Sequence, residues 1–493
     1  MENLDSIKHL LFVGTFFAVI ALDLVLVRIA KPLHVIGMDH LTRGMKVCTV
    51  LILILMIFFS SWGMTINPIW NGETESQRDQ YEKFTESLLR GHLYFDNVPV
   101  DEKLLEMDNP YDPNARQELQ VRYAWDHAYY NGHYYFYYGV VPVFLLFAPY
   151  RLITGTSLTG FHATQVFVAA LFCGVFCLFR LLAKKFFQNM SFAAWLFLSV
   201  TVSLTSIWSG IAAPALYNTA VSSALCMEVW SLFFYSKAVW DSEAEKENTA
   251  IRYAFFGALF GALAFGCRPN IALGNLLAIP MLVVFLKQRR LRPALFWKLV
   301  AAVLPYVVIG TLLMLYNKVR FDNPFEFGQS YQLTIADQSD YGTRGLSALH
   351  WVTFSNGLIF NFFQSPQLIH SFPFVGAGGV FLAYPVFCYA FFGAIDERTR
   401  GLVREKHLGF FLTMLIVIAA LITAVGVTWA PYMVDRYRED VIWLIGILAF
   451  LCAGLRLQTV SNPVESSRWI CRWCIWSLAV GFMLCSDMAL TGM

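Results

Sequence analysis

The chain has 493 residues, of which 57% are hydrophobic and 14% are charged, and its net charge is +2. A soluble domain is typically about 45–50% apolar and about 25% charged, so the composition excludes an ordinary soluble protein. The small net charge gives no support for a nucleic-acid partner. The apolar residues fall into runs near the length of about 20 residues that crosses a bilayer, which predicts an all-α polytopic membrane protein.

The apolar runs predict about twelve membrane-spanning helices, taken here in chain order. We place them at about 9–29, 47–65, 161–182, 192–211, 215–236, 253–267, 270–286, 299–316, 372–394, 408–428, 441–457 and 471–490. An acidic N-terminus precedes the first run and no small-residue cleavage site follows it. We therefore interpret the first run as a retained helix and not as a cleaved signal peptide.

Lysines and arginines gather in the loops that follow the odd-numbered spans. Outside two long loops, the opposite side of the membrane receives only Lys8, Arg268, Arg436 and Arg438. Basic loops stay on the cytoplasmic side, so both termini and both long loops are expected on the outer face.

The two long outer loops cover about residues 66–160 and 317–371. Each contains an apolar segment, at 139–154 and 350–364, that is too short to cross a bilayer. If residues 139–154 crossed, the later basic loops would all lie outside. We therefore expect re-entrant or interfacial helices in both places.

Residues 78–91 of the first long loop predict an amphipathic helix on the membrane surface. Its apolar positions, at near-helical spacing, are Tyr81, Phe84, Leu88 and Leu89.

Five polar clusters map to the outer face and suggest one shared site there. They are WNGETESQRDQYEKF with Glu73, Glu75 and Asp79; YAWDHAYYNGHYYFYYG with Asp126, His127 and Tyr137; GCRPN with Arg268 and Asn270; YNKVRFDNPFEFGQSYQL with Asn317; and APYMVDRYRED with Arg436, Tyr437 and Arg438.

Each cluster also has an ordinary structural interpretation. The acids can be a solvated helix start that suits the helix dipole, or one can accept a proton from an attacking group. Arg268 either binds a lipid phosphate or extends to lipid headgroups. Arg436 and Arg438 either clamp a phosphate together or pair with neighbouring acids. Asn317 precedes an Asn-Pro turn, so a structural role is the default.

The sequence predicts no metal and no cofactor. Asp126, His127 and His133 match no standard zinc spacing. Cys471 and Cys474 form a single C-x-x-C in an apolar run, which favours two ordinary helix residues, and we expect no disulfides.

These clusters, in this order, resemble the GT-C superfamily of membrane glycosyltransferases. The similarity is greatest to the bacterial branch related to protein O-mannosyltransferases and aminoarabinose transferases (glycosyltransferase family 39-like). It is carried by GETESQRDQYEKFTESLLRGHLYF, YYFYYGVVPVFLLFAPY, GCRPN, the asparagine-to-NPFEFG stretch, and the R-Y-x-x-D of Arg436, Tyr437 and Asp440. The adjacent Asp-Glu of that branch is absent, and Glu73-Thr-Glu75 stands near its place.

The resemblance implies transfer of a sugar from a polyprenyl-phosphate donor to a lipid, glycan or protein acceptor, with inversion, at the outer face of a bacterial inner membrane. It divides the chain into an added helix and cytoplasmic loop (1–45), a core (46–457) and a C-terminal helix (458–493). The implied base is Glu75, then Asp79, then Glu73; Arg268, Arg436 and Arg438 are expected at the donor phosphate. The residues expected at the sugar or acceptor are Tyr81, Asp126, His127, Tyr137, Asn270, Asn317 and Tyr437.

Three alternatives remain at this point. A transporter or flippase of lipid-linked sugar predicts charged residues at mid-membrane depth, and only Asp23 and Glu228 are acids well inside spans. A surface-polysaccharide polymerase or ligase would share outer-face chemistry. A non-catalytic membrane scaffold would need no chemistry at the outer face.

Overall fold

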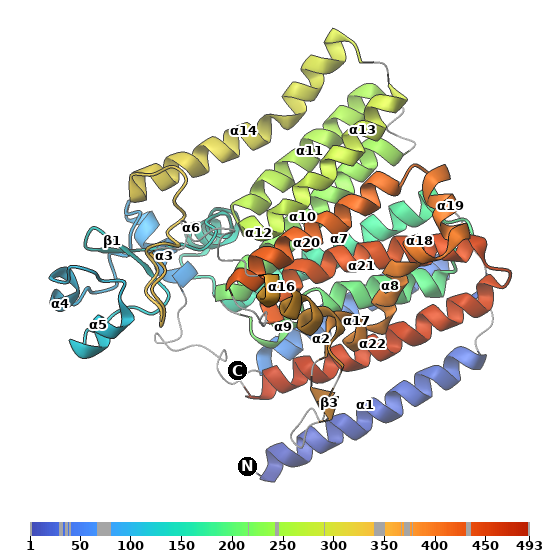
Figure 1. Ribbon diagram of the computed structural model, residues 1–493, viewed down its shortest axis with the longest axis horizontal. Coiled ribbons are helices and arrows are strands. Elements are labelled where there is room, and N and C mark those ends of the chain that lie inside the picture. The colour runs from blue at the N-terminus through green and yellow to red at the C-terminus, as the bar shows by residue number, and fades with distance from the viewer. Residues whose placement is uncertain are drawn as a thin grey trace.

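The protein is a bundle of long helices that run side by side, with one large irregular region at one end (Figure 1). The computed structural model describes residues 2–28, 33–34, 38, 41–66, 80–214, 216–241, 246–289, 291–339, 351–365, 367–368, 375–376, 378–429 and 435–491. Within these residues, eight helices are long and apolar enough to cross a membrane. The predicted class, an all-α polytopic membrane protein, is confirmed.

The helices of the bundle follow the predicted spans closely. They are α1 (Glu2–Arg28), α2 (Arg43–Ile66), α7 (Gly160–Phe186), α8 (Phe192–Thr205), α9 (Trp208–Ala212), α10 (Leu216–Trp240), α11 (Glu247–Phe265), α12 (Pro269–Ala272), η6 (Leu273–Leu277), α13 (Ala278–Gln288), α14 (Pro293–Phe321), α20 (Gly409–Trp429), α21 (Asp435–Thr459) and α22 (Pro463–Thr491). Several begin with proline in the first turn, where the missing N–H costs nothing.

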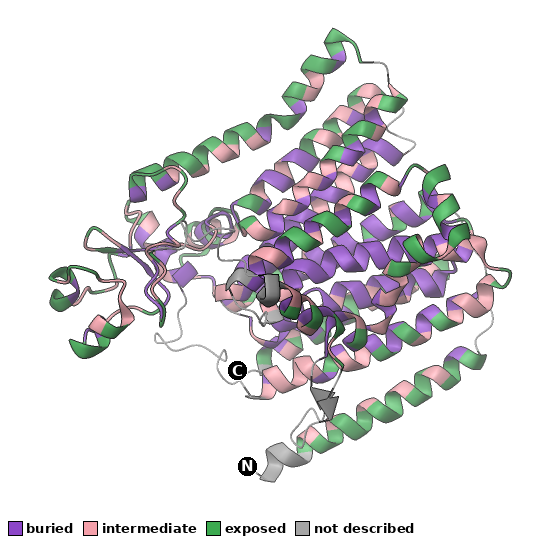
Figure 2. Ribbon diagram, viewed as in Figure 1, coloured by how far each residue is buried: buried purple, intermediate pink, exposed green. Residues whose placement is uncertain are grey.

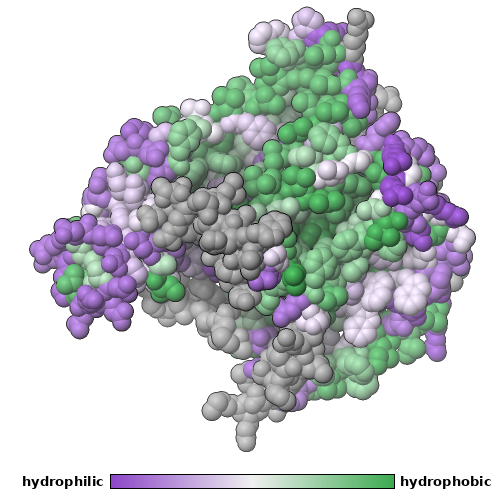
Figure 3. All heavy atoms as spheres, viewed as in Figure 1, coloured by the Kyte–Doolittle hydropathy of each residue, from purple (hydrophilic) through white to green (hydrophobic). Residues whose placement is uncertain are grey.

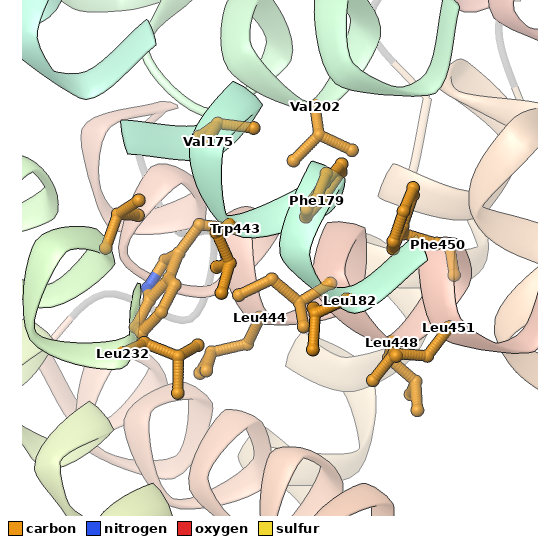
Figure 4. Packing of buried hydrophobic residues seen from close by; sticks show 14 of the residues in the cluster. Val175, Phe179, Leu182, Val202, Leu232, Trp443, Leu444, Leu448, Phe450 and Leu451 are labelled. Atoms are coloured by element: carbon orange, nitrogen blue, oxygen red, sulfur yellow. The ribbon is translucent and has the colours of Figure 1, made fainter. Parts of the chain in front are cut away.

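The core of the bundle lies around α7, α10 and α21. Phe179 of α7 stacks on Phe450 of α21, with ring centres 3.8 Å apart, and Trp443 packs nearby among leucine and valine side chains (Figure 4). Each of these three aromatic side chains is almost fully buried, and burial of such large apolar surfaces is the main stabilising contribution. The site described below is therefore built against the well-packed core of the bundle.

Exposed apolar residues cover the sides of the bundle. Hydrophilic residues gather over the large loop at one end and around α19 (Glu397–Glu405) at the other, with hydrophobic residues between them (Figure 3). The outer helices α1 and α14 are largely exposed along their length, whereas α21 is almost wholly buried (Figure 2). This distribution fits a molecule whose sides contact lipid.

The two ends of the bundle carry the loops that the charge pattern assigns to opposite sides of the membrane. The large loop lies at one end and the basic helix α19 at the other, and α1 begins and α22 ends toward the loop end (Figure 1). The two groups of loops that the charge pattern separates therefore lie at opposite ends of the bundle.

One predicted span is wrong as a continuous helix. The structure divides the described part of 372–394 into β4 (Val375–Gly376), α17 (Val380–Ala383), the 3₁₀ helix η9 (Pro385–Phe391) and α18 (Phe392–Ile395). Three glycines and Pro385 interrupt the apolar run. Proline removes a helix hydrogen bond, and a Cβ at Gly379 would lie 2.3 Å from the backbone of Phe362.

Both short outer segments form short helices, as expected. The first consists of the π-helical turn η4 (Val143–Phe147) and α6 (Ala148–Thr154), and the second of α16 (Trp351–Leu358) and η8 (Ile359–Phe363). At about 1.5 Å per residue neither reaches across the hydrocarbon core of about 30 Å.

The first long loop folds around its own aromatic core. Its elements are α3 (Gln80–Leu89), α4 (Glu102–Leu105), α5 (Pro113–Glu118), β1 (Ala128–Tyr130) and β2 (His133–Tyr135); a second small pair joins β3 (Gln367–Leu368) to β4. The helix predicted at 78–91 is present from Gln80. Its apolar face is buried against the loop itself and does not lie on the membrane surface, because Phe84 stacks on Phe136 with ring centres 5.0 Å apart.

The two acids inside spans have different partners. Asp23 of α1 accepts a hydrogen bond of 2.6 Å from Nε of Arg472 in α22, which ties the peripheral first helix to the bundle. Glu228 of α10 is buried and accepts a hydrogen bond of 2.7 Å from Asn275 in η6. All ten cysteines are unpaired, and both Cys471 and Cys474 are buried in α22.

Candidate functional site

A cavity of about 500 Å³ lies between the first long loop and the helix bundle. Its walls come from the aromatic tract, α10, the turn between α11 and α12, α14, the second long loop, α20 and α21. Among the described residues that line it, the charged ones are Asp126, Arg268, Arg320, Arg436 and Asp440. Three arginines and two aspartates give this lining a net charge of +1, which favours an anionic ligand.

The aromatic tract reaches the cavity as a β-hairpin. Strand β1 pairs with β2 in an antiparallel arrangement, and Asn131 and Gly132 form the turn with φ angles of +47° and +77°. Asn-Gly is the preferred sequence for such a two-residue turn. The hairpin brings the tyrosines at 137 and 138, which follow β2, next to Asp126, which precedes β1.

Asp126 is the centre of a hydrogen-bond network that joins three parts of the chain. Its carboxylate accepts from Gln332 Nε2 at 2.5 Å and from Tyr138 at 3.4 Å, and the hydroxyl of Tyr217 in α10 also donates to it. Gln332 further donates to the Tyr137 hydroxyl at 2.6 Å. The backbone of Asp126 is held in the left-handed region at φ +57°, a conformation that is uncommon outside glycine and often occurs at functional sites.

Burial raises the pKa of the Asp126 carboxyl, and the bond from Gln332 and the positive charge of Arg436 act in the opposite direction. The pKa of the Tyr137 hydroxyl is also raised by burial, so it stays protonated and can donate. A buried carboxylate among hydroxyl groups can accept a hydrogen bond from a sugar or an acceptor hydroxyl.

Arg268 pairs with an acid that the sequence analysis did not assign to it. Its Nε lies 2.8 Å from Oδ1 of Asp440, and its Nη2 lies 2.8 Å from Oδ2. The pair joins the turn after α11 to α21, and the Arg268 side chain is 15% exposed where it lines the cavity. The ion pair with Asp440 explains how the positive charge of Arg268 is tolerated in this apolar stretch.

Arg436 packs on tyrosine rings at the cavity wall. Its guanidinium carbon lies 4.1 Å from the ring centre of Tyr217 and 5.4 Å from that of Tyr437. Tyr437 also lies under Arg268, at 5.5 Å from ring centre to guanidinium carbon. Two arginines therefore converge on one tyrosine at the cavity, where aromatic rings stabilise them without neutralising their charge.

Arg438, predicted to clamp a phosphate together with Arg436, lies apart from the cavity. Arg438 donates to Asn361 Oδ1 at 3.3 Å and lies by the ring of Phe360, and it does not line the cavity. Residues two apart on a helix face in nearly opposite directions, whereas Arg436 and Asp440, four apart, share a face. Of these two arginines, Arg436 is the one that lines the cavity.

Asn317 and Arg320 form the wall contributed by α14. Arg320 Nη2 donates to Asn317 Oδ1 at 2.7 Å, and its guanidinium lies 3.7 Å from the ring centre of Tyr316. Asn317 also donates to the carbonyl of Pro324 at 3.3 Å, the turn role expected by default. Asn270, the first residue after Pro269 in α12, lines the cavity as well.

Two predicted contact residues lie away from the cavity. Tyr81 is fully buried and stacks on Phe147, 5.2 Å between ring centres, so it belongs to the aromatic core of the loop. His127 is buried against Phe95 and Tyr134, and burial lowers the pKa of its imidazole to about 4. Neither side chain is placed to contact a sugar in the cavity.

The three acids predicted as candidates for the base, Glu73, Glu75 and Asp79, lie outside the described residues, which resume at Gln80. Gln80 donates to the carbonyl oxygen of Asp126 at 2.7 Å. The described residues contain no group of three or more His, Cys, Asp or Glu side chains that could hold a metal ion.

The cavity residues that hydrogen-bond its charged groups or carry charge themselves include four that the sequence analysis did not assign to the site: Tyr217, Arg320, Gln332 and Asp440. Asp440 was the last residue of the R-Y-x-x-D motif, and Arg320 follows Asn317 by three residues, so spacing could have indicated both. Tyr217 and Gln332 carry no local signal, because only the tertiary fold brings them to Asp126.

Gly139 fixes where the aromatic tract meets the bundle. A Cβ at this position would lie 2.0 Å from the carbonyl oxygen of Cys267. The next turn of chain is tied to the same place, since the N–H of Val141 donates to the carbonyl of Gly266 at 3.0 Å. The backbone of the loop therefore touches the backbone next to Arg268, which only glycine permits.

Fold and cavity together define a polytopic helical membrane protein with an arginine-lined site at the end of its bundle. No protein-family model matches the chain, and no curated protein matches it. Among solved structures, the chain is similar to ArnT from Cupriavidus metallidurans in the apo state, at 14% identity and a TM-score of 0.43, covering 91% of this chain and 76% of that one.

A second solved structure is the Archaeoglobus fulgidus oligosaccharyltransferase tethered to an acceptor peptide with the sequon NVT. The identity is 11% and the TM-score 0.42, and the match covers 89% of this chain and 55% of that one.

Proposed function

We propose that the protein is a membrane glycosyltransferase that moves a sugar from a polyprenyl-phosphate donor to a lipid, glycan or protein acceptor at the outer face of a bacterial inner membrane. The observation that carries the proposal is the cavity itself. It places Arg268 and Arg436 beside the buried carboxylate of Asp126, at the end of the bundle that the charge pattern assigns to the outside.

The reaction needs an anion-binding group where the donor leaves. As the acceptor attacks, the bond between the anomeric carbon and the phosphate oxygen breaks, and the polyprenyl phosphate departs with the bonding electrons. Arg268 and Arg436 are the groups we assign to this developing charge, because preorganised cations in a partly dehydrated cavity stabilise it most. Neither needs a metal for this role.

The acceptor must lose a proton as its new bond to the anomeric carbon forms. We assign this proton to an acid in the 73–79 segment, with Glu75 preferred over Asp79 and Glu73. Gln80, the residue that follows this segment, donates a hydrogen bond from its side chain to the carbonyl oxygen of Asp126 at the cavity wall. Attack from the face opposite the leaving phosphate would invert the anomeric centre.

The remaining lining residues suit a sugar. Tyr137 and Tyr437 offer aromatic surface, and Asn270, Asn317 and Asp126 offer polar groups, all at the wall of one cavity. Stacking on aromatic rings together with a few directional hydrogen bonds is how concave sites orient small polar ligands.

The test is transfer of labelled sugar from a polyprenyl-phosphate donor by purified protein in detergent or liposomes. Glu75→Gln, Asp79→Asn, Glu73→Gln and Arg268→Gln are compared singly with the wild-type chain. We expect Arg268→Gln and one of the acid variants to lose transfer by roughly 100-fold or more, the usual effect of removing a general base or a charge-stabilising group. Full transfer by all four variants would falsify the site assignment.

Transport and transfer are separated by a second measurement. A transporter or flippase of lipid-linked sugar would move label across vesicle membranes without forming a new glycosidic bond, which counterflow and product analysis distinguish. Of the two acids that the sequence analysis placed well inside spans, Asp23 pairs with Arg472 through a hydrogen bond of 2.6 Å, and Glu228 accepts a hydrogen bond of 2.7 Å from Asn275. A polymerase or ligase would instead require a polymeric glycan donor.

A further inference from the structure

The pairing of Arg268 with Asp440 leaves part of the guanidinium group available. The contact is side-on, because it uses Nε and Nη2 and not the end of the group. Arginine has five N–H donors. Two serve Asp440, so three remain: both on Nη1 and the second on Nη2. No other described residue accepts a hydrogen bond from this guanidinium.

The two partners differ in exposure. The Asp440 side chain is 2% exposed and the Arg268 side chain 15% exposed, and both line the cavity. The acid is the buried member of the pair, and the arginine is the member that a ligand can reach.

Asp440 is itself held rigidly. It lies on α21, the most buried of the long helices, and Nε1 of Trp443 donates to its carbonyl oxygen at 2.9 Å. Trp443 is 2% exposed. Arg268, by contrast, lies at the end of a turn, directly before Pro269. The fixed carboxylate therefore determines where the guanidinium of a long, flexible side chain points.

We propose that Asp440 is a positioning residue that holds Arg268 side-on so that the three remaining N–H groups bind the donor phosphate. The inference rests on the proposed function, because it assigns how Arg268 is aimed at the phosphate. Asp440 itself contacts neither the phosphate nor the reacting atoms. Lysine cannot replace Arg268, because an ammonium group that pairs with Asp440 presents no planar second edge to a phosphate.

The test uses binding of geranylgeranyl phosphate, a short prenyl phosphate without sugar, to the purified full chain in detergent. The variants are Asp440→Asn, which weakens the pair, and Arg268→Lys, which keeps a cation beside Asp440. Asp23→Asn is the matched control, because it removes the acid from another arginine–aspartate pair that joins two helices away from the cavity.

We expect Asp440→Asn and Arg268→Lys each to weaken binding by roughly 10- to 100-fold, the factor that corresponds to losing a charged hydrogen bond. Asp23→Asn should bind as the wild-type chain does, whatever its thermal midpoint. In transfer assays, Asp440→Asn should raise KM for the donor more than it lowers kcat, because the phosphate is mislocated and the base is untouched.

The outcomes separate the two proposals. If the wild-type chain does not bind the prenyl phosphate, the proposed function fails. If it binds and both variants bind within about twofold of it, the proposed function stands and the role of Asp440 is overturned. If Asp440→Asn does not fold, Arg268→Lys decides alone: weak binding by a folded variant supports the inference and normal binding overturns it.

Discussion

Arg436 and Asp126 share one tyrosine. The guanidinium carbon of Arg436 lies 4.1 Å from the ring centre of Tyr217, and the hydroxyl of the same ring donates to the Asp126 carboxylate. The guanidinium of Arg436 packs on the face of the Tyr217 ring, and the carboxylate of Asp126 accepts a hydrogen bond from the hydroxyl at the edge of the same ring. One side chain of α10 thereby sets the relative positions of a charge on α21 and a charge on the large loop.

Substitution of Arg436 by glutamine should weaken donor binding, because the cavity loses one of its three arginines and Tyr217 loses the cation on its ring. We expect roughly a 10- to 100-fold loss in affinity for prenyl phosphate, the effect of removing one charge-assisted hydrogen bond. Titration of the purified protein with geranylgeranyl phosphate measures it.

Arg438 provides a control two residues away on the same helix. Arg438→Gln removes the same charge, but its side chain is directed to Asn361 and Phe360. Prenyl-phosphate affinity should stay within about twofold of wild type. Equal losses in the two variants would mean that net charge, and not the position of Arg436, governs binding.

Asp126 should make the free energy of unfolding fall as the pH rises from about 4 toward neutrality. Its folded-state pKa is raised by burial above the unfolded value of about 3.9, so the folded chain binds this proton more tightly than the unfolded chain does. The resulting stabilisation is present below the unfolded pKa and is lost as the pH rises through the folded pKa. The Asp126→Asn variant lacks the titrating carboxyl, so its free energy of unfolding does not carry this pH dependence.

The thermal midpoint of the wild-type chain should therefore fall relative to that of Asp126→Asn as the pH rises from about 4 toward neutrality. Paired melting curves across this range measure the difference. A constant difference would show that Asp126 titrates in the folded chain as it does in the unfolded chain.

Phe84 should be structural. It is fully buried and packs between Phe136 and Phe95, with ring centres at 5.0 Å and 5.9 Å. Phe84→Ala should cost about 3–5 kcal/mol, the usual penalty for emptying an aromatic position in a core. Limited proteolysis should then cut the first long loop of the variant faster than that of the wild-type chain, and unchanged cleavage would contradict the packing.

The overall architecture could be predicted from the sequence because its signals are local. Apolar runs locate the helices, and the charge bias predicts which loops lie at the same end. The interrupted stretch at 372–394 was mispredicted because hydropathy alone does not register Pro385 and the glycines before it. The hairpin at Asn131–Gly132 was missed although the Asn-Gly turn signal is present.

The site could be predicted only in part. Arg268, Arg436, Tyr437 and Asp126 were identified and line one cavity. Their partners were not, since a hydrogen bond such as that from Gln332 to Asp126 joins residues 206 positions apart. Tyr81 was predicted at the sugar or acceptor and lies in the aromatic core of the loop, because the sequence does not distinguish an aromatic residue that faces a ligand from one that packs on a neighbouring ring.

The sidedness of the molecule can be tested with single cysteines at two exposed positions at opposite ends of the bundle. Glu118 is the last residue of α5 in the first long loop, and Arg400 lies on α19. In intact cells, a membrane-impermeant maleimide should label Glu118→Cys and spare Arg400→Cys until the membrane is opened. The reverse pattern would place the cavity on the cytoplasmic side and remove the basis of the proposed function.

The close approach at Gly139 holds the first long loop and the helix bundle in a fixed relative position. A methyl group added at this position would lie 2.0 Å from the Cys267 carbonyl oxygen, so the two backbones have no room to move closer together. An alanine at this position would act as a wedge and displace the peptide next to Arg268. We therefore expect Gly139→Ala to impair the proposed transfer reaction through the backbone beside Arg268, although Gly139 has no side chain that takes part in chemistry.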